Sequence, residues 1–193
     1  MIITKKDLKH YLTQDAIALR KEDKKRPSLF GDEVWKFQIV LRKTEYFVNA
    51  YRGSKKFYIF HAAWYRRKFH KLSVKLGFSI PLNVFGPGLS IAHYGTIIVN
   101  SMAKVGKNCR IQEGVNIGAT NGSNLAPQIG DNVFIGTGAK IIGDITIADD
   151  VAIGANAVVV KSITESGCTY AGVPAKKISS NNSHSNLCSK LFE

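Results

Sequence analysis

The sequence contains few cysteines: only Cys109, Cys168 and Cys188 occur among its 193 residues. Their number is odd and their spacing matches no common metal-ligand pattern, so we expect neither a disulfide framework nor a zinc site. We expect all three to be reduced thiols. Nucleophilic catalysis by one of them is the alternative that composition leaves open.

Long apolar runs are also missing from the sequence. No stretch approaches the roughly eighteen uninterrupted apolar residues of a membrane-spanning helix. The N-terminus lacks the apolar core of a signal peptide. We therefore expect a cytoplasmic protein.

Acidic residues are absent from positions 46–112, and the charge of the chain is uneven. Residues 1–76 hold 19 Lys and Arg against 7 Asp and Glu, a net charge of +12 out of +13 for the whole chain. Such a basic region suits a nucleic acid or an anionic membrane. No known nucleic-acid motif accompanies it, so we expect no nucleic-acid partner.

Residues 57–71 mix aromatic side chains with cations. This composition suits the headgroup layer of an anionic membrane. The alternative is that the aromatic rings pack the helices against the rest of the protein while the cations are solvated. The sequence leaves both interpretations open.

The most regular feature of the sequence is an aliphatic residue at every sixth position from 99 to 159, interrupted once at Ser123. A six-residue period fits neither an α-helix nor an isolated strand, but it fits a chain that turns a corner every sixth residue. We predict a solenoid with three short strands per coil and a continuous apolar core. A β-sandwich, the alternative, would not keep one phase over so long a stretch. The repeating residues are Val99, Val105, Ile111, Ile117, Ile129, Ile135, Ile141, Ile147, Ile153 and Val159.

Six glycines fall where corners of the solenoid are expected. We attribute them to backbone angles that residues with a Cβ rarely adopt. They are Gly106, Gly118, Gly130, Gly136, Gly143 and Gly154.

Residues 1–76 lack the six-residue period, and their pattern predicts helices at about 5–20, 32–48 and 57–76. Asp32 is the expected cap of the second helix, and Gly53-Ser54 separates the second from the third. We therefore divide the chain into a basic α-helical N-terminal region (1–76), a repeat domain (77–178) and a flexible polar tail (179–193).

Four short segments add a family resemblance to the repeat. They are 91–95 (Ile-Ala-His-Tyr-Gly), 117–120 (Ile-Gly-Ala-Thr), 135–140 (Ile-Gly-Thr-Gly-Ala-Lys) and 171–176 (Ala-Gly-Val-Pro-Ala-Lys). With them, residues 77–178 resemble the left-handed β-helix (hexapeptide repeat) acyltransferases, and within them the serine acetyltransferase-like branch. The resemblance implies a mainly β fold, a left-handed parallel β-helix that assembles as a homotrimer or a dimer of trimers. It also implies acetyl-CoA as the acyl donor and no metal.

Transfer of an acetyl group to a hydroxyl needs a base that takes the hydroxyl proton, and histidine suits this task near neutral pH. Of five histidines, His93 lies just before the regular coils. The resemblance implies that His93 is the general base of a direct transfer without a covalent intermediate.

Because residues 46–112 hold no acid, we expect Glu113 to orient the His93 imidazole. The alternative is that Glu113 faces water and that Asn83, Asn116 or a backbone carbonyl takes its place. Tyr94, Asn83 and Asn116 are also the candidate acceptor-binding residues.

The resemblance places the pantetheine arm of acetyl-CoA along a coil edge between two subunits. Lys176 and Lys177 are candidates to meet the CoA phosphates as point charges, with solvated lysines as the alternative. The donor-binding candidates carried over by position are Gly118, Ala119, Thr120, Thr137, Gly138, Ala155, Gly172, Pro174, Lys176 and Lys177.

Three departures from serine acetyltransferases concern the acceptor. Ala92 stands where those enzymes have an Asp, Leu125-Ala126 replaces an Arg-His pair, and Ser79 lies near the position of a second Asp. We therefore favour an acceptor that has no charged groups for the enzyme to bind, namely a sugar of a cell-surface polysaccharide. We expect this sugar to be modified in the cytoplasm, at the inner face of the membrane. Serine O-acetylation for cysteine synthesis is the alternative, and a structural β-helix protein without a donor site is the non-enzyme alternative.

Overall fold

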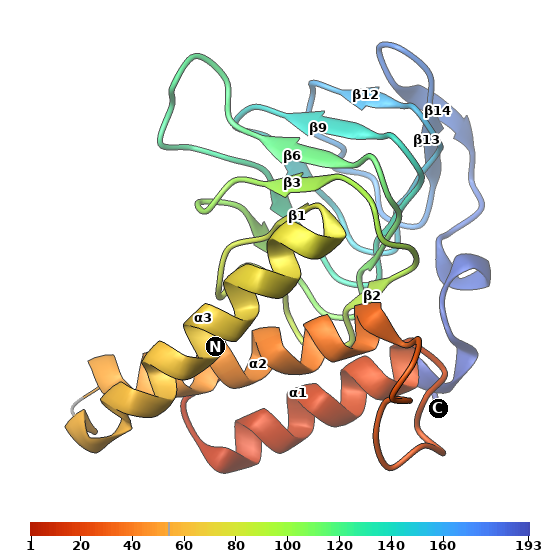
Figure 1. Ribbon diagram of the computed structural model, residues 1–193. Helices are drawn as coiled ribbons and strands as arrows, with labels where there is room; N and C mark the ends of the chain where they lie inside the picture. Colours follow the sequence, from red (N-terminus) through yellow and green to blue (C-terminus); the bar gives the residue numbers. More distant parts are fainter. Residues whose placement is uncertain (54) are drawn as a thin grey trace.

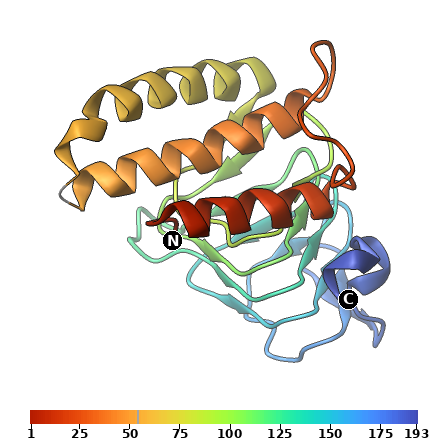
Figure 2. The same cartoon turned by 90° about the horizontal axis from the view of Figure 1, so that it is seen from below.

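The computed structural model describes residues 1–53 and 55–193, which form a β-helix with a layer of helices across its N-terminal end (Figure 1). The helices are α1 (Lys5–Ala18), α2 (Glu33–Arg52) and α3 (Ile59–Leu76), with the short 3-10 helix η1 (Lys56–Tyr58) before α3. Figure 2 shows α2 lying between α1 and α3 in this layer. The three predicted helices are confirmed, although α2 continues past the expected end to Arg52. Ser54, part of the predicted break, lies outside the described residues.

Asp32 precedes α2 as predicted, but its carboxylate does not cap the helix. The Asp32 backbone is left-handed, with φ of 52°, and its side chain accepts from the Lys21 ammonium at 2.8 Å and the Ser28 N–H at 3.0 Å. These two hydrogen bonds hold the pKa of Asp32 well below its usual range. The carboxylate therefore closes the loop between α1 and α2 instead of starting the helix.

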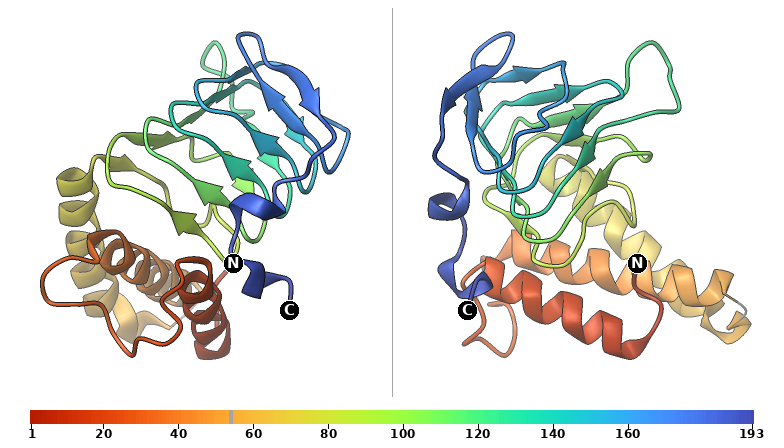
Figure 3. Two further views of the ribbon diagram at one scale, coloured as in Figure 1. Left: turned by 90° about the vertical axis from the view of Figure 1, so that its right-hand side faces the viewer. Right: turned by 180° about the vertical axis from the view of Figure 1, so that it is seen from behind.

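Short strands form three faces of a prism, and Figure 3 shows their coils stacked along its axis. Face A contains β1 (Phe78–Ser79), β3 (Ile97–Val99), β6 (Asn116–Gly118), β9 (Lys140–Ile142) and β12 (Val158–Val159). Face B contains β4 (Lys104–Val105), β7 (Gln128–Ile129) and β10 (Thr146–Ile147). Face C contains β2 (Ser90–Ile91), β5 (Arg110–Ile111), β8 (Phe134–Ile135), β11 (Ala152–Ile153), β13 (Thr169–Ala171) and β14 (Lys176–Ser179). Neighbours pair in parallel except β13 with β14, so the predicted solenoid is confirmed and the sandwich is excluded.

The residues of the six-residue period fill the interior of the prism. The strand register places Ile111 beside Ile135 and Ile135 beside Ile153, and all three side chains are fully buried. Cys109 is also buried, and burial raises the pKa of its thiol to about 12. A thiol that stays protonated at neutral pH is a poor nucleophile, so Cys109 is a core residue.

The expectation about the corner glycines is wrong for all but one of them. Only Gly143 adopts a positive φ, at 109°. A Cβ placed on Gly106 or Gly136 would lie 2.7 or 2.8 Å from backbone atoms of the next coil, closer than real Cβ atoms come. These glycines therefore permit close stacking of coils rather than unusual backbone angles.

Asparagine and aspartate occupy the left-handed positions at the corners between faces B and C. Asn108, Asn132 and Asp150 have φ values of 57°, 56° and 60°. The Asn108 amide donates to Asn132 Oδ1 at 2.8 Å, and the Asn132 amide donates to Asp150 Oδ1 at 2.9 Å. Asn and Asp tolerate this conformation, and here they also link successive coils.

The C-terminal segment packs against the rest of the protein, so the prediction of a flexible tail at 179–193 is wrong. It contains two 3-10 helices, η2 (His184–Asn186) and η3 (Ser189–Leu191), and runs beside face C to the helical layer (Figure 3). Leu187 and Cys188 are buried. Lys190 Nζ lies 2.5 Å from the Glu22 carboxylate beyond the end of α1. Because most residues of the segment are polar, its sequence does not reveal these few anchoring contacts.

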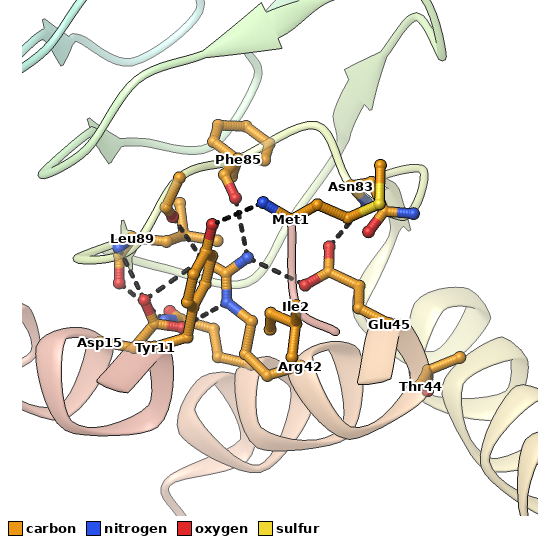
Figure 4. Close-up of polar contacts among 12 residues, drawn as sticks. Met1, Ile2, Tyr11, Asp15, Arg42, Thr44, Glu45, Asn83, Phe85 and Leu89 are labelled. Atoms are coloured by element: carbon orange, nitrogen blue, oxygen red, sulfur yellow. Dashed lines mark hydrogen bonds and ion pairs between the residues drawn. The ribbon is translucent and has the colours of Figure 1, made fainter. Parts of the chain in front are cut away.

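A buried ion-pair cluster joins the helical layer to the first coil (Figure 4). The Arg42 side chain is fully buried and donates to both oxygens of Asp15, at 2.7 and 3.2 Å, and to Glu45 at 3.1 Å. Arg42 also donates to the backbone carbonyls of Phe85 and Gly86, at 2.9 and 2.6 Å. One side chain therefore connects α1 and α2 with the chain before β2.

No helix of the described residues is long and apolar enough to cross a membrane. No group of three or more His, Cys, Asp or Glu side chains in the same residues is placed to hold a metal ion.

Candidate functional site

Successive corners that lead from face C to face A form one edge of the prism, which we call the C–A edge. Backbone hydrogen bonds join neighbouring corners: Gly138 N–H donates to the Glu113 carbonyl at 2.8 Å, and Asn156 N–H donates to the Thr137 carbonyl at 2.8 Å. His93 lies in the corner after β2, next to the helical layer. Counted from this layer, the corners are residues 92–96, 112–115, 136–139 and 154–157. The turn at 172–175, which joins β13 to β14 within face C, continues the same edge.

The predicted donor-binding residues fall on two edges. Those in or just after the C–A corners are Thr137, Gly138, Ala155, Gly172, Pro174, Lys176 and Lys177. Those at the end of β6, on the edge between faces A and B, are Gly118, Ala119 and Thr120. Within one chain, His93 therefore lies on the same edge of the prism as the first group, whereas the second group lies on a different edge.

Two contacts fix parts of the C–A edge. Thr137 donates both its N–H and its hydroxyl to Gln112 Oε1, at 2.9 and 3.0 Å, and so ties two corners together. Lys177 Nζ lies 2.5 Å from the Glu165 carboxylate, which raises the pKa of Lys177. Lys176 is exposed.

His93 faces a pocket of about 510 Å³ between the first coil, the helical layer and the C-terminal segment. Both His93 and Tyr94 are exposed at its wall. A volume of this size is typical of small-molecule sites. Residues that line it include Arg20, Asp32, Trp35, His93, Arg110 and Asn186.

The sequence analysis missed Arg20, Trp35, Arg110 and Asn186. Arg20, Trp35 and Asn186 come from the helical layer and the tail, and no sequence pattern shows where these parts dock. Arg110 offers a weak signal, because it is a charged residue directly before the inward-facing Ile111.

Glu113 lies in the corner next to that of His93, but no hydrogen bond of the described residues joins the two side chains. A Cβ on Gly95 would lie 3.1 Å from Glu113 Cβ, so the corner that carries His93 stacks directly on Glu113. The Glu113 Oε2 atom is buried and has no hydrogen-bond partner among the described residues. One carboxylate oxygen of Glu113 is thus buried without a hydrogen-bond donor among the described residues, in the corner next to that of His93.

The other candidate acceptor residues lie away from the pocket. The Asn83 amide exchanges hydrogen bonds with the Asn49 amide at 2.8 and 3.1 Å. Asn83 N–H also donates to Glu45 at 2.7 Å (Figure 4). Asn116 begins β6 on face A. Within one chain, only Tyr94 of the three therefore accompanies His93.

Comparisons with known proteins agree with this architecture. Residues 126–161 match the family model "Bacterial transferase hexapeptide (six repeats)". A serine acetyltransferase of Mycobacterium tuberculosis is 40% identical over 100 residues, which is 51% of this chain and 43% of that protein. A serine acetyltransferase of Staphylococcus xylosus is 36% identical over 117 residues, 56% of this chain and 54% of that protein. The chain thus spans about half the length of these curated relatives.

Solved structures cover more of the chain. Serine acetyltransferase from Brucella abortus in complex with coenzyme A has a TM-score of 0.71 at 28% identity, covering 92% of this chain and 70% of that one. A bacterial transferase hexapeptide repeat serine O-acetyltransferase from Brucella melitensis has a TM-score of 0.68 at 30% identity, covering 92% of this chain and 69% of that one. The likeness extends over the helical layer as well as the coils.

Proposed function

Because this chain belongs to the bacterial hexapeptide-repeat transferases, we propose that it is an acetyl-CoA-dependent O-acetyltransferase with His93 as the general base. The observation that supports this most is the position of His93, exposed at a pocket and at one end of the edge that carries the candidate donor contacts. The small side chains on that edge, Gly138, Ala155 and Gly172, leave its backbone open to an extended ligand.

In the proposed reaction, the acceptor hydroxyl attacks the carbonyl carbon of the thioester while His93 takes the hydroxyl proton. The new C–O bond forms, and the C–S bond then breaks. The proton on the His93 imidazole passes to the leaving sulfur, so that the products are an acetate ester and a free thiol. The imidazole ends the cycle neutral, and no covalent enzyme intermediate is needed.

We propose that the working unit is a homotrimer, alone or as a dimer of trimers. The candidate donor residues lie on two different edges of one prism, Gly118 to Thr120 on one and Thr137 to Ala155 on the other. One ligand that touches both sets needs the edge of a second copy beside it. Each donor site would then lie between two subunits.

L-serine is the first acceptor that we propose, because the curated relatives and the solved structures named above are serine acetyltransferases. They favour this alternative over the polysaccharide sugar that we expected from the sequence. A sugar hydroxyl remains the second candidate. Ala126 is buried and Leu125 is apolar, so the loop at 119–127 has no charged side chain at these two positions to bind a charged acceptor.

The test of the proposed function is thiol release from acetyl-CoA, with L-serine and separately with neutral sugars and nucleotide sugars as acceptors. Turnover that depends on one of these acceptors is expected. If calorimetry shows no acetyl-CoA binding and no acceptor gives turnover, the chain is a structural β-helix protein instead.

Glu113→Gln is expected to lower kcat about tenfold, as part of the 10²- to 10⁴-fold that a general base supplies. We propose Glu113 as a positioning residue for His93, since its buried, unpartnered oxygen lies in the next corner. The pH–rate profile should also change, because the variant presents an amide instead of a carboxylate in the corner beside the imidazole. Asp144→Asn, at an exposed corner, is the matched control. An unchanged rate and profile in Glu113→Gln would rule this role out.

We also propose that the helical layer contacts an anionic membrane surface. Phe57, Phe60 and Trp64 are 69%, 83% and 56% exposed, so packing against the coils does not explain them. Phe69, by contrast, stacks on Phe37 with ring centroids 5.6 Å apart. The exposed rings share α3 and its N-terminal turn with exposed cations, namely Arg66, Arg67, Lys68 and Lys71.

The Phe60→Ser/Trp64→Ser double variant is expected to bind phosphatidylglycerol vesicles at least about tenfold more weakly than wild type, because two exposed rings no longer enter the bilayer. Co-sedimentation measures this, with neutral phosphatidylcholine vesicles as the reference. Leu125→Ser, at an exposed position on the coils, is the control. Unchanged vesicle binding with a changed oligomeric state would assign the face to contacts between copies.

A further inference from the structure

Both acids that line the pocket beside His93 are already paired. Asp32 binds Lys21 at 2.8 Å, and Glu33 binds Lys36 at 3.3 Å. Their charges are therefore neutralised within the helical layer itself. Neither carboxylate is free to balance a further cation in the pocket.

Two arginines line the same pocket without such a partner. No ion pair of the described residues includes Arg20 or Arg110. Both side chains line the pocket together with His93. The pocket thus carries two positive charges that its own residues leave unbalanced.

Arg110 stands on the outer side of face C, where the strand register places it beside Ser90 of β2. One of its five N–H donors binds Ser90 Oγ at 3.1 Å. The side chain is half-buried, and burial, with the nearby charge of Arg20, lowers the pKa of Arg110. Arginine nevertheless stays charged at neutral pH. A partly desolvated guanidinium is unfavourable until an anion binds it.

Arg20 follows α1 and has a left-handed backbone with φ of 56°. Its N–H donates to the Ile17 carbonyl at 2.9 Å. This conformation is strained for a residue with a Cβ, so it persists only where its surroundings hold it. The backbone of Arg20 is therefore fixed at the end of α1, and its exposed side chain lines the pocket.

The two arginines come from two elements: Arg20 follows α1 in the helical layer, and Arg110 lies on β5, one coil beyond the corner of His93. The candidate donor corners follow the C–A edge away from the helical layer, whereas Arg20 belongs to that layer. His93 stands in the corner between them. An anion held by both arginines therefore lies in the pocket beside His93, between the helical layer and face C.

We propose that the acceptor carries an anionic group, a carboxylate or a phosphate, which binds between Arg20 and Arg110 while its hydroxyl faces His93. This inference rests on the proposed acetyltransferase function. It replaces the expectation of an acceptor without charges to clamp. The charges come from the helical layer and face C, not from the loop at 119–127.

Matched acceptor pairs test the inference whatever the acceptor class. The pairs are L-serine with L-serinamide, D-glucuronate with D-glucose, and glucose 1-phosphate with D-glucose. The anionic member of a pair that is turned over should be preferred. L-serine or glucuronate as the preferred member identifies a carboxylate, and glucose 1-phosphate identifies a phosphate.

Arg110→Gln is expected to lower kcat/KM for the preferred anionic acceptor about 10- to 100-fold, the usual effect of losing hydrogen bonds to a charged group. The preference for the anionic over the neutral member of the pair should fall, and KM for acetyl-CoA should not change. Arg20→Gln, at an exposed position, should act in the same direction if the Arg110 variant fails to fold. Arg52→Gln, at the exposed C-terminal end of α2, is the control.

Equal use of neutral and anionic acceptors, or a higher KM for acetyl-CoA in Arg110→Gln, would overturn the inference and leave the acetyltransferase intact. Calorimetry with glucuronate and glucose 1-phosphate separates the two claims further. Arginine-dependent binding of either anion without any turnover would retain the anion site while the proposed function fails.

Discussion

Replacing His93 by alanine is expected to lower kcat by about 10²- to 10⁴-fold, the range that a general base supplies. His93 is the one histidine that lines the pocket among the described residues, so no other imidazole stands ready to take the acceptor proton. KM for acetyl-CoA should change little, because the candidate donor contacts lie in later corners of the C–A edge.

Steady-state thiol release measures this effect. His70→Ala, on the exposed part of α3, is the control and should retain the wild-type rate. A loss of less than tenfold in His93→Ala would mean that water or another group removes the acceptor proton.

Arg42→Ala is expected to lower the free energy of unfolding by about 3–5 kcal/mol, the usual cost of breaking a buried ion pair from one side. The substitution leaves the carboxylates of Asp15 and Glu45 buried without their cation. It also removes the hydrogen bonds to the carbonyls of Phe85 and Gly86, which hold the first coil to the helical layer.

Urea denaturation measures the loss. Lys107→Ala is the matched control, because Lys107 lies 3.7 Å from Asp131 in an exposed pair that is worth at most about 1 kcal/mol. A loss below that value in Arg42→Ala would mean that the cluster does not join the two parts of the protein. Since Arg20 and Trp35 belong to the helical layer, loosening the junction should also reduce turnover.

The solenoid could be predicted because its signal is local and repeated. Successive coils place aliphatic residues such as Ile111 and Ile135 at equivalent inward positions. One six-residue repeat in the sequence is therefore enough to predict the strands of all three faces. The role of the glycines could not be predicted in this way. A glycine required by a left-handed backbone and one required by a close neighbouring coil, such as Gly136, look alike in a sequence.

The short segment around His93 is enough to predict the candidate base from the sequence. The residues that form the walls of its pocket cannot be predicted in this way. Arg20, Arg110 and Asn186 are separated by long stretches of chain, and only the docking of the helices and the tail brings them together. That docking depends on Arg42 with Asp15, a pair 27 residues apart, for which no short motif exists. The sequence predicts a flexible tail for a similar reason, because anchors such as the Lys190–Glu22 ion pair join residues that are far apart in the chain.

Mass spectrometry of the acceptor, after incubation with acetyl-CoA and either wild type or His93→Ala, tests the proposed acetyltransferase most directly. We expect wild type to produce an O-acetylated acceptor in amounts that match the released thiol, and His93→Ala to produce little. Thiol release without an acetylated acceptor, or equal product from both proteins, would contradict direct transfer with His93 as the base.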